Sequence, residues 1–167
     1  LFMALTRSAI RANVRGAASP AEGIAGANRL ICAESTRGLF VTLLFGLLDP
    51  VSGDMTSVNA GHNPPLFYRA AEDDLTLHKA TGMPLGIDMA ANFSQRSIRM
   101  QPGDFLVLYT DGITEARAPG RGMFGREGVL EVLAKAMDGS LDEMTNLLMD
   151  AATDHAPGPA DERSESG

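Results

Sequence analysis

The segment Tyr109-Thr110-Asp111-Gly112 follows an apolar run and contains the residues best suited to chemistry. The run 105–109 is predicted to be a strand that is apolar on both faces, which is typical of a central strand. Asp111 would then present a carboxylate where the strand ends, and Gly112 would let the main chain turn sharply there. A hard divalent cation prefers such oxygen ligands. From these residues alone, a simple turn and a metal site both stay open.

A second irregular segment, Gly61-His62-Asn63, is followed by two prolines. The prolines fix the main chain and restrict the conformation of Asn63. His62 has the chemistry of a ligand or a general acid, but the sequence offers no second histidine at ligand spacing. We therefore expect the His62 ring to brace the loop through main-chain hydrogen bonds, with Gly61 and Asn63 as its support.

Helical periodicity covers residues 1–35 and 123–155, and a polar tail fills residues 156–167. Within the second helical block, Ser140 and Glu143 are predicted to form a capping box. The segments between 39 and 110 are predicted to be antiparallel strands, with one central strand at 105–109 and the others at 40–48, 55–60, 66–69, 75–79 and 95–100. Helices and strands in separate blocks predict an α+β class rather than an alternating α/β fold. The length of 167 residues fits a single domain.

The first predicted helix has an apolar face made by Leu1, Leu5, Ala9 and Ala12. The second should begin with a capping box in which Ser19 is the N-cap and Glu22 its partner. Its predicted apolar face consists of Ile24, Ala27, Leu30 and Ile31. We expect this helical pair to pack on one sheet. A bend at 82–86 should place apolar side chains in the core.

The formal net charge of −7 argues against unaided binding to nucleic acid or to an anionic membrane. It is compatible with a protein partner or with a divalent cation held by carboxylates. The single cysteine, Cys32, offers no disulfide framework. No apolar run approaches the ~20 residues that span a bilayer, so the simplest expected location is the cytoplasm.

Several segments occur in a characteristic order: SPAEGIAGANRLI, FVTLLFGLLDPVSGDM, SVNAGHNPPLFYR, GMPLGI, MQPGDFLVLYTDGITEAR, and MFG before a helix. Together they resemble the metal-dependent (PPM, type-2C) protein serine/threonine phosphatases, in the SpoIIE/RsbU-like bacterial branch. The resemblance covers residues 1–155. It implies a four-layer α-β-β-α sandwich of antiparallel sheets. Because two upstream acidic segments of the family are missing, we expect an incomplete domain, truncated at both ends.

The resemblance also implies a two-metal Mn²⁺ or Mg²⁺ site in which Asp111 and Asp161 are ligands and Gly112 is part of the surrounding main chain. In such enzymes a metal-activated water hydrolyses phosphoserine or phosphothreonine, and no catalytic side chain beyond the metal ligands is expected. The implied substrate is an anti-sigma-factor antagonist, and the implied input comes from an upstream sensor or receiver domain. Two carboxylates hold two ions poorly, so the chain as given is expected to be nearly inactive. The alternative is a catalytically degenerate module that binds a regulatory partner.

Overall fold

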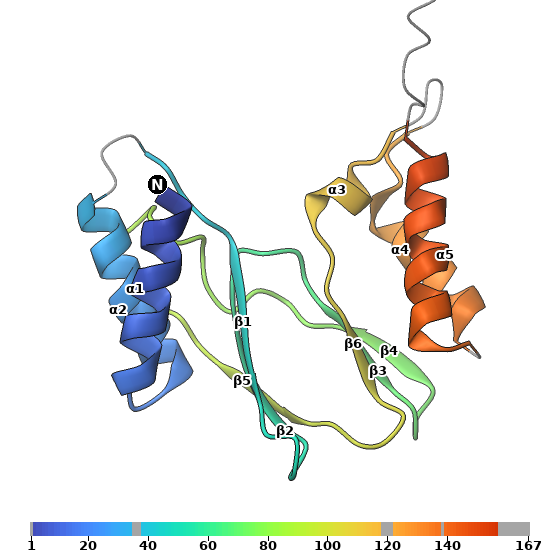
Figure 1. Cartoon of the computed structure of the whole chain (residues 1–167), viewed down its shortest axis with the longest axis horizontal. Coiled ribbons are helices and arrows are strands. Elements are labelled where there is room, and N and C mark those ends of the chain that lie inside the picture. The colour runs from blue at the N-terminus through green and yellow to red at the C-terminus, as the bar shows by residue number, and fades with distance from the viewer. Residues whose placement is uncertain (1, 35–37, 118–121, 138, 157–167) are drawn as a thin grey trace, which may run out of the picture. The chain divides into compact units, whose positions relative to one another are not determined.

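The computed structural model describes residues 2–34, 38–117, 122–137 and 139–156 (Figure 1). Contacts within the chain divide it into two compact units, Leu1–Leu108 and Tyr109–Gly167. The first unit holds both helices of the N-terminal pair and all the named strands, and the second holds the remaining helices. Among the described residues, no helix is both long and apolar enough to cross a membrane.

The N-terminal helical pair consists of α1 (Phe2–Gly16) and α2 (Pro20–Glu34). The predicted start of α2 is confirmed. The Glu22 amide donates a hydrogen bond to Ser19 Oγ at 3.2 Å, and the Gly23 amide donates to the Ser19 carbonyl at 3.0 Å. These bonds satisfy main-chain donors that a helix N-terminus leaves without intrahelical partners.

The buried side of α1 differs from the predicted face. Leu5 and Ala12 are exposed, whereas Thr6 and Ala9 are buried. The helices approach closely at one point, since a Cβ added at Gly23 would lie 2.6 Å from the Val14 Cα atom. Such an approach favours small side chains at the interface. Helical periodicity thus correctly predicted the burial of Ala9 in α1 and of Ile24, Ala27 and Ile31 in α2, but it missed Thr6 and wrongly included Leu5 and Ala12. In α2, similarly, Leu30 is half exposed and Asn28 is completely buried.

The helical pair packs on a three-stranded sheet of order β1-β2-β5, as predicted. Its strands are β1 (Leu43–Leu48), β2 (Asp54–Ala60) and β5 (Arg96–Arg99), and both strand pairs are antiparallel. The buried cluster between helices and sheet comprises Ala9, Ile24, Ala27, Ile31, Val58, Ala60 and Leu85. Leu85 belongs to the predicted bend at 82–86, whereas Met83 in the same bend is exposed.

The second sheet has the order β4-β3-β6, with strands β3 (Leu66–Arg69), β4 (Asp74–Leu77) and β6 (Phe105–Val107). The prediction of a central strand at 105–109 is wrong for the described residues, because β6 pairs there with β3 alone. It is also shorter than predicted, and Leu108 is 57% exposed. An apolar run does not reveal how many neighbours a strand has. The antiparallel sheets and separate helices confirm the α+β class.

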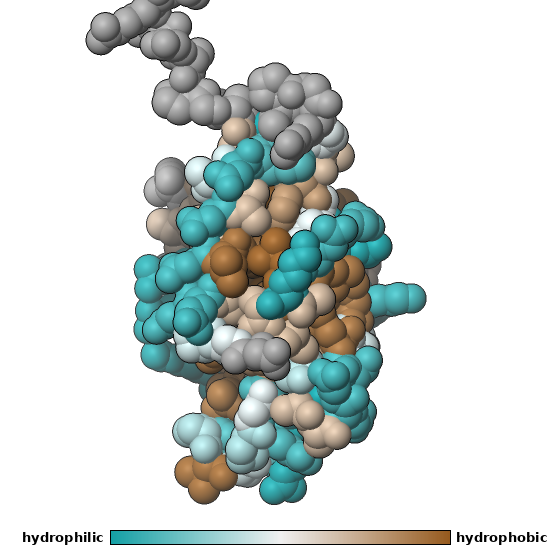
Figure 2. All heavy atoms as spheres, turned by 90° about the vertical axis from the view of Figure 1, so that its right-hand side faces the viewer, coloured by the Kyte–Doolittle hydropathy of each residue, from teal (hydrophilic) through white to brown (hydrophobic). Residues whose placement is uncertain are grey.

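The second unit contains α3 (Asp111–Thr114), α4 (Gly125–Ala136) and α5 (Leu141–Asp154). The predicted capping box of α5 is present: the Glu143 amide donates to Ser140 Oγ, and the Glu143 carboxylate accepts from the Ser140 amide. Figure 2 shows apolar surface among hydrophilic side chains over this unit. Its helices bury Val129, Leu133, Ala136, Met144, Leu148 and Ala152.

Candidate functional site

The sequence predicted Asp111 at the end of a strand. In the structure it is instead the first residue of the short helix α3. Tyr109 is buried, and Thr110 is an extended N-cap (φ −107°, ψ 172°) without a side-chain cap hydrogen bond. The carbonyl of Asp111 accepts a hydrogen bond from the Glu115 amide at 2.7 Å. Its side chain is exposed, and its carboxylate makes no hydrogen bond or ion pair with the other described residues. Both carboxylate oxygens therefore remain available to a ligand.

Gly112 is not required by the local backbone geometry. Its φ lies outside the left-handed region, and an added Cβ would meet only Thr110 Oγ1, at 3.6 Å. An ordinary side chain fits this position without strain. The expectation that glycine permits a sharp turn here is therefore wrong for this structure. A role for its main chain beside a metal stays a prediction.

The described residues do not by themselves form a metal site. They contain no group of three or more His, Cys, Asp or Glu side chains able to hold an ion. Asp161, the predicted second ligand, lies outside the described residues. A single exposed carboxylate is a weak ligand for Mn²⁺ or Mg²⁺, which take about six oxygen ligands. Asp111 accordingly supplies one ligand at most, and the rest of the predicted site stays a prediction.

The Gly61-His62-Asn63 loop is held mainly by Asn59, at the end of β2. Asn59 Oδ1 accepts a hydrogen bond from the His62 amide at 2.8 Å, and Asn59 is only 3% exposed. The His62 ring contacts a side chain, with Nδ1 lying 3.3 Å from Thr42 Oγ1. This partner differs from the main-chain partner we expected for the ring. The signal in the sequence was the Asn three residues before His62, a spacing at which Asn side chains bind nearby amides.

Gly61 is required by geometry. Its φ is +72°, and an added Cβ would lie 2.6 Å from Pro84 Cδ. The loop is thus pressed against the bend at 82–86. Thr81 fastens that bend to β2, because its amide donates to the Asn59 carbonyl and its hydroxyl accepts from the Asn59 amide, both at 2.9 Å.

Two amide nitrogens in this region are buried without a hydrogen-bond partner among the described residues: Nδ2 of Asn59 and Nδ2 of Asn63. A buried donor without a partner costs roughly 1–3 kcal/mol. The loop therefore retains unused hydrogen-bonding capacity around His62. This is a property of the Gly61-His62-Asn63 segment that its residue types alone did not indicate.

Burial determines the protonation of two aromatic residues. It raises the pKa of the Tyr109 phenol above its ordinary value of 10.0, and the nearby Arg126 opposes this only in part. Tyr109 is therefore neutral at physiological pH and unsuited to act as a nucleophile. Burial also lowers the pKa of His78 below its ordinary value of 6.5, and Arg96 adds to that shift. His78 packs against Phe67, with ring centroids 5.4 Å apart.

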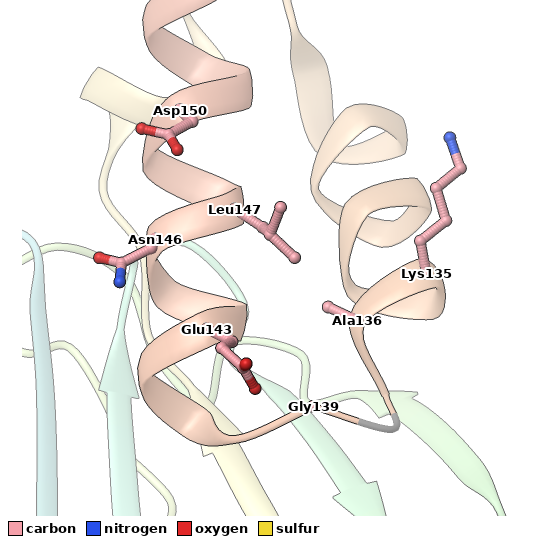
Figure 3. A pocket seen from close by; sticks show the side chains of 7 residues that line it. All are labelled: Lys135, Ala136, Gly139, Glu143, Asn146, Leu147 and Asp150. Atoms are coloured by element: carbon pink, nitrogen blue, oxygen red, sulfur yellow. The ribbon is translucent and has the colours of Figure 1, made fainter.

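A cavity of about 640 Å³ lies between α4 and α5 and contains none of the predicted site residues. Figure 3 shows Leu147 directed toward α4, while the side chains of Asn146 and Asp150 point away from α4. Glu143 is already engaged in the capping box. A catalytic centre requires polar groups that converge on one point, and the polar groups here do not. The residues that line the cavity are Lys135, Ala136, Gly139, Glu143, Asn146, Leu147 and Asp150.

The fold and the Asp111 segment agree with a phosphatase-type domain of the type-2C class. The family described as Stage II sporulation protein E (SpoIIE) matches residues 1–163, so the chain belongs to that family. Protein IcfG of Synechocystis sp. is 38% identical over 95 residues, which are 57% of this chain and 15% of that protein. Phosphoserine phosphatase RsbU of Bacillus subtilis is 25% identical over 132 residues, covering 79% of this chain and 39% of the relative.

A solved structure supports the same fold. The RsbU and RsbW domains of Rv1364c from Mycobacterium tuberculosis match with a TM-score of 0.72 and 25% identity, over 93% of this chain and 43% of that one. This similarity confirms the predicted fold class. The chain spans less than half the length of both curated relatives.

Proposed function

We propose that this chain is part of a metal-dependent protein phosphatase that hydrolyses phosphoserine or phosphothreonine on a regulatory protein. The observation that carries the proposal is the continuous family match over residues 1–163, which includes the Asp111 segment. The similarity to a phosphoserine phosphatase over 79% of the chain supports the same chemistry.

Asp111 is the residue to which we assign metal binding. In support, its carboxylate is exposed and engaged with no other described side chain, and hard carboxylate oxygens suit Mn²⁺ or Mg²⁺. We assign Asp161 as a second ligand by the family resemblance alone. When bound, the ions would supply electrostatic stabilisation of phosphoryl oxygens and an activated water. The described residues contribute one carboxylate to that chemistry, so other ligands are needed to complete the site.

The proposed substrate is a small phosphorylated protein of the anti-sigma-factor antagonist type. This rests on the likeness to RsbU and to a structure that joins RsbU and RsbW domains. Control by an upstream sensor or receiver domain and a cytoplasmic location belong to the same proposal.

One observation favours a second candidate, a degenerate phosphatase module that binds a partner without catalysis. Among residues 2–34, 38–117, 122–137 and 139–156, no three potential ligands gather. The two candidates differ in whether turnover occurs at all, so an activity measurement separates them.

The test uses the complete natural polypeptide with Mn²⁺ or Mg²⁺ and a panel of phosphoserine proteins. We expect phosphate release by the wild type and a loss of at least ~100-fold in Asp111→Asn, since removing a metal ligand withdraws much of the ion's effect. Asp150→Asn, a matched change of an exposed carboxylate on α5, should retain activity. Metal-dependent phosphate release retained in Asp111→Asn would refute the ligand assignment. If the wild type releases no phosphate with either ion, the result favours the degenerate module.

A further inference from the structure

The exposed side of α1 carries three arginines, Arg7, Arg11 and Arg15, at four-residue spacing. This spacing places them one above another, about 6 Å apart along the helix. None of the three makes an ion pair or a side-chain hydrogen bond with the other described residues. The opposite side of α1 packs on α2 and the first sheet. The arginine stripe, as we name these three residues, therefore faces solvent.

No acidic side chain within α1 offsets the repulsion along the arginine stripe, and only Arg15, in the last turn, gains from the helix dipole. Like charges four residues apart destabilise a helix by roughly 0.2–0.5 kcal/mol for each pair, and Arg7–Arg11 and Arg11–Arg15 are two such pairs. Residues 2–16 contain no acidic side chain. Solvent or an acidic group outside α1 would offset the remaining repulsion.

The stripe also stands out against the charge of the whole chain. Residues 1–34 contain four arginines and two glutamates, a net charge of +2. The remaining residues contain ten basic and nineteen acidic side chains, a net charge of −9. An acidic partner is therefore attracted to the N-terminal helices and repelled by the rest of the chain. Such a distribution orients a partner as it approaches.

We propose that Arg7, Arg11 and Arg15 form a docking surface for an acidic helix of a partner protein. A helix with carboxylates at four-residue spacing matches the repeat of the stripe, and each guanidinium can bind a carboxylate with two parallel hydrogen bonds. Beside the central part of the stripe the exposed residues Ala4, Ser8 and Ala12 are small, which allows a second helix to come close. The larger exposed residues Met3 and Leu5 lie at the N-terminal end of α1.

A helix fits this surface better than an extended polyanion does. A nucleic acid or an anionic bilayer reaches beyond three residues. Residues 35–108 of the same unit carry five basic and seven acidic side chains, a net charge of −2, so they add no attraction for an extended polyanion. A single helix contacts the stripe alone. This docking surface does not depend on phosphatase activity, and its test needs no turnover.

The probe is a fluorescent, alanine-rich helical peptide with three glutamates at four-residue spacing, and the matched probe has glutamines in their place. Fluorescence anisotropy should show saturable binding of the glutamate probe only. In the triple variant Arg7→Gln, Arg11→Gln and Arg15→Gln, we expect at least ~tenfold weaker binding, from three exposed pairs of up to about 1 kcal/mol each. Raising the salt to ~0.3 M should weaken wild-type binding through screening.

The triple Arg→Lys variant keeps the charge but loses the two parallel hydrogen bonds of each guanidinium, so its affinity should lie between those of the wild type and the glutamine triple. The control variant Arg96→Gln with Arg99→Gln, which changes exposed arginines on β5, should bind as the wild type does. A melting temperature of the triple glutamine variant at or above that of the wild type shows that the fold is intact. The proposal is overturned if the glutamine triple binds normally or if the β5 control loses binding equally. Stripe-dependent binding of phosphatidylserine vesicles without peptide binding would also overturn it, since it indicates a lipid surface.

Discussion

Asn28 donates a hydrogen bond from its side-chain amide to the main-chain carbonyl of Asp88 at 2.8 Å. The same side chain accepts a hydrogen bond from the Gly86 amide at 2.9 Å. One fully buried side chain in α2 thus binds both ends of the segment 86–88. We expect Asn28→Ala to reduce the free energy of unfolding by about 1–3 kcal/mol, because it removes two part-buried hydrogen bonds and leaves the Gly86 amide and the Asp88 carbonyl without these partners. Urea denaturation measures this, and the exposed Asn92→Ala change should have little effect.

The same glycine-to-alanine change should have opposite effects at two positions. At Gly61, the left-handed φ and the proximity of Pro84 should make alanine destabilising by about 2–4 kcal/mol. At Gly16, the last residue of α1, nothing lies within 4 Å of an added Cβ. There, alanine should stabilise the chain by roughly 0.5–1 kcal/mol. Thermal unfolding measures both effects. A shift of the melting temperature in the same direction for both variants would contradict this account.

Stability should fall in mild acid because of His78. Its pKa in the folded chain is lowered below the ordinary 6.5 by burial, so the unfolded chain binds the proton first as the pH decreases. The contribution is therefore complete above pH 6.5 and is lost as the pH falls through 6.5 toward the folded pKa. His78→Phe keeps a ring against Phe67 but removes the titration. Comparing the unfolding free energies of both proteins over about three pH units, from roughly 5 to 8, should show a shallower slope for the variant. Equal slopes would exclude His78 as the cause.

The capping box of α5 provides a local test. Ser140 Oγ accepts from the Glu143 amide at 3.2 Å, and the Glu143 carboxylate accepts from the Ser140 amide at 2.8 Å. Hydrogen bonds from the Ser140 main chain and then its hydroxyl lower the pKa of Glu143. Ser140→Ala should cost about 1 kcal/mol, measured by denaturation, whereas Ser140→Thr should keep most of the stability. A loss in the threonine variant as large as in alanine would argue against the cap.

The sequence predicted the order and type of the elements better than their faces and neighbours. The caps at Ser19 and Ser140 were found because they depend on residues three apart. The burial of Thr6 instead of Leu5 was missed because it depends on how closely another helix approaches. Within the part of the chain that the structure describes, β6 pairs with β3 alone. This was missed for a related reason, since pairing is a property of the sheet rather than of the strand.

The candidate site was predictable to the extent that it depends on motifs. Asp111 was identified from its segment, but its position at the start of α3 was not, because a four-residue helix leaves almost no periodic signal. Asn59 and Asn28 were missed as organising residues. Both residues make tertiary hydrogen bonds that join segments 22 and 58 residues apart. Local sequence patterns do not indicate such distant pairs.

The close approach of Gly23 to Val14 limits how the N-terminal helices can move. Rotation of α2 about its own axis would bring a larger side chain, such as Ile24, to a place where even a methyl group lies 2.6 Å from the Val14 Cα atom. The helices must separate before either one can turn. We therefore expect α1 and α2 to move together as one unit relative to the sheet on which they pack.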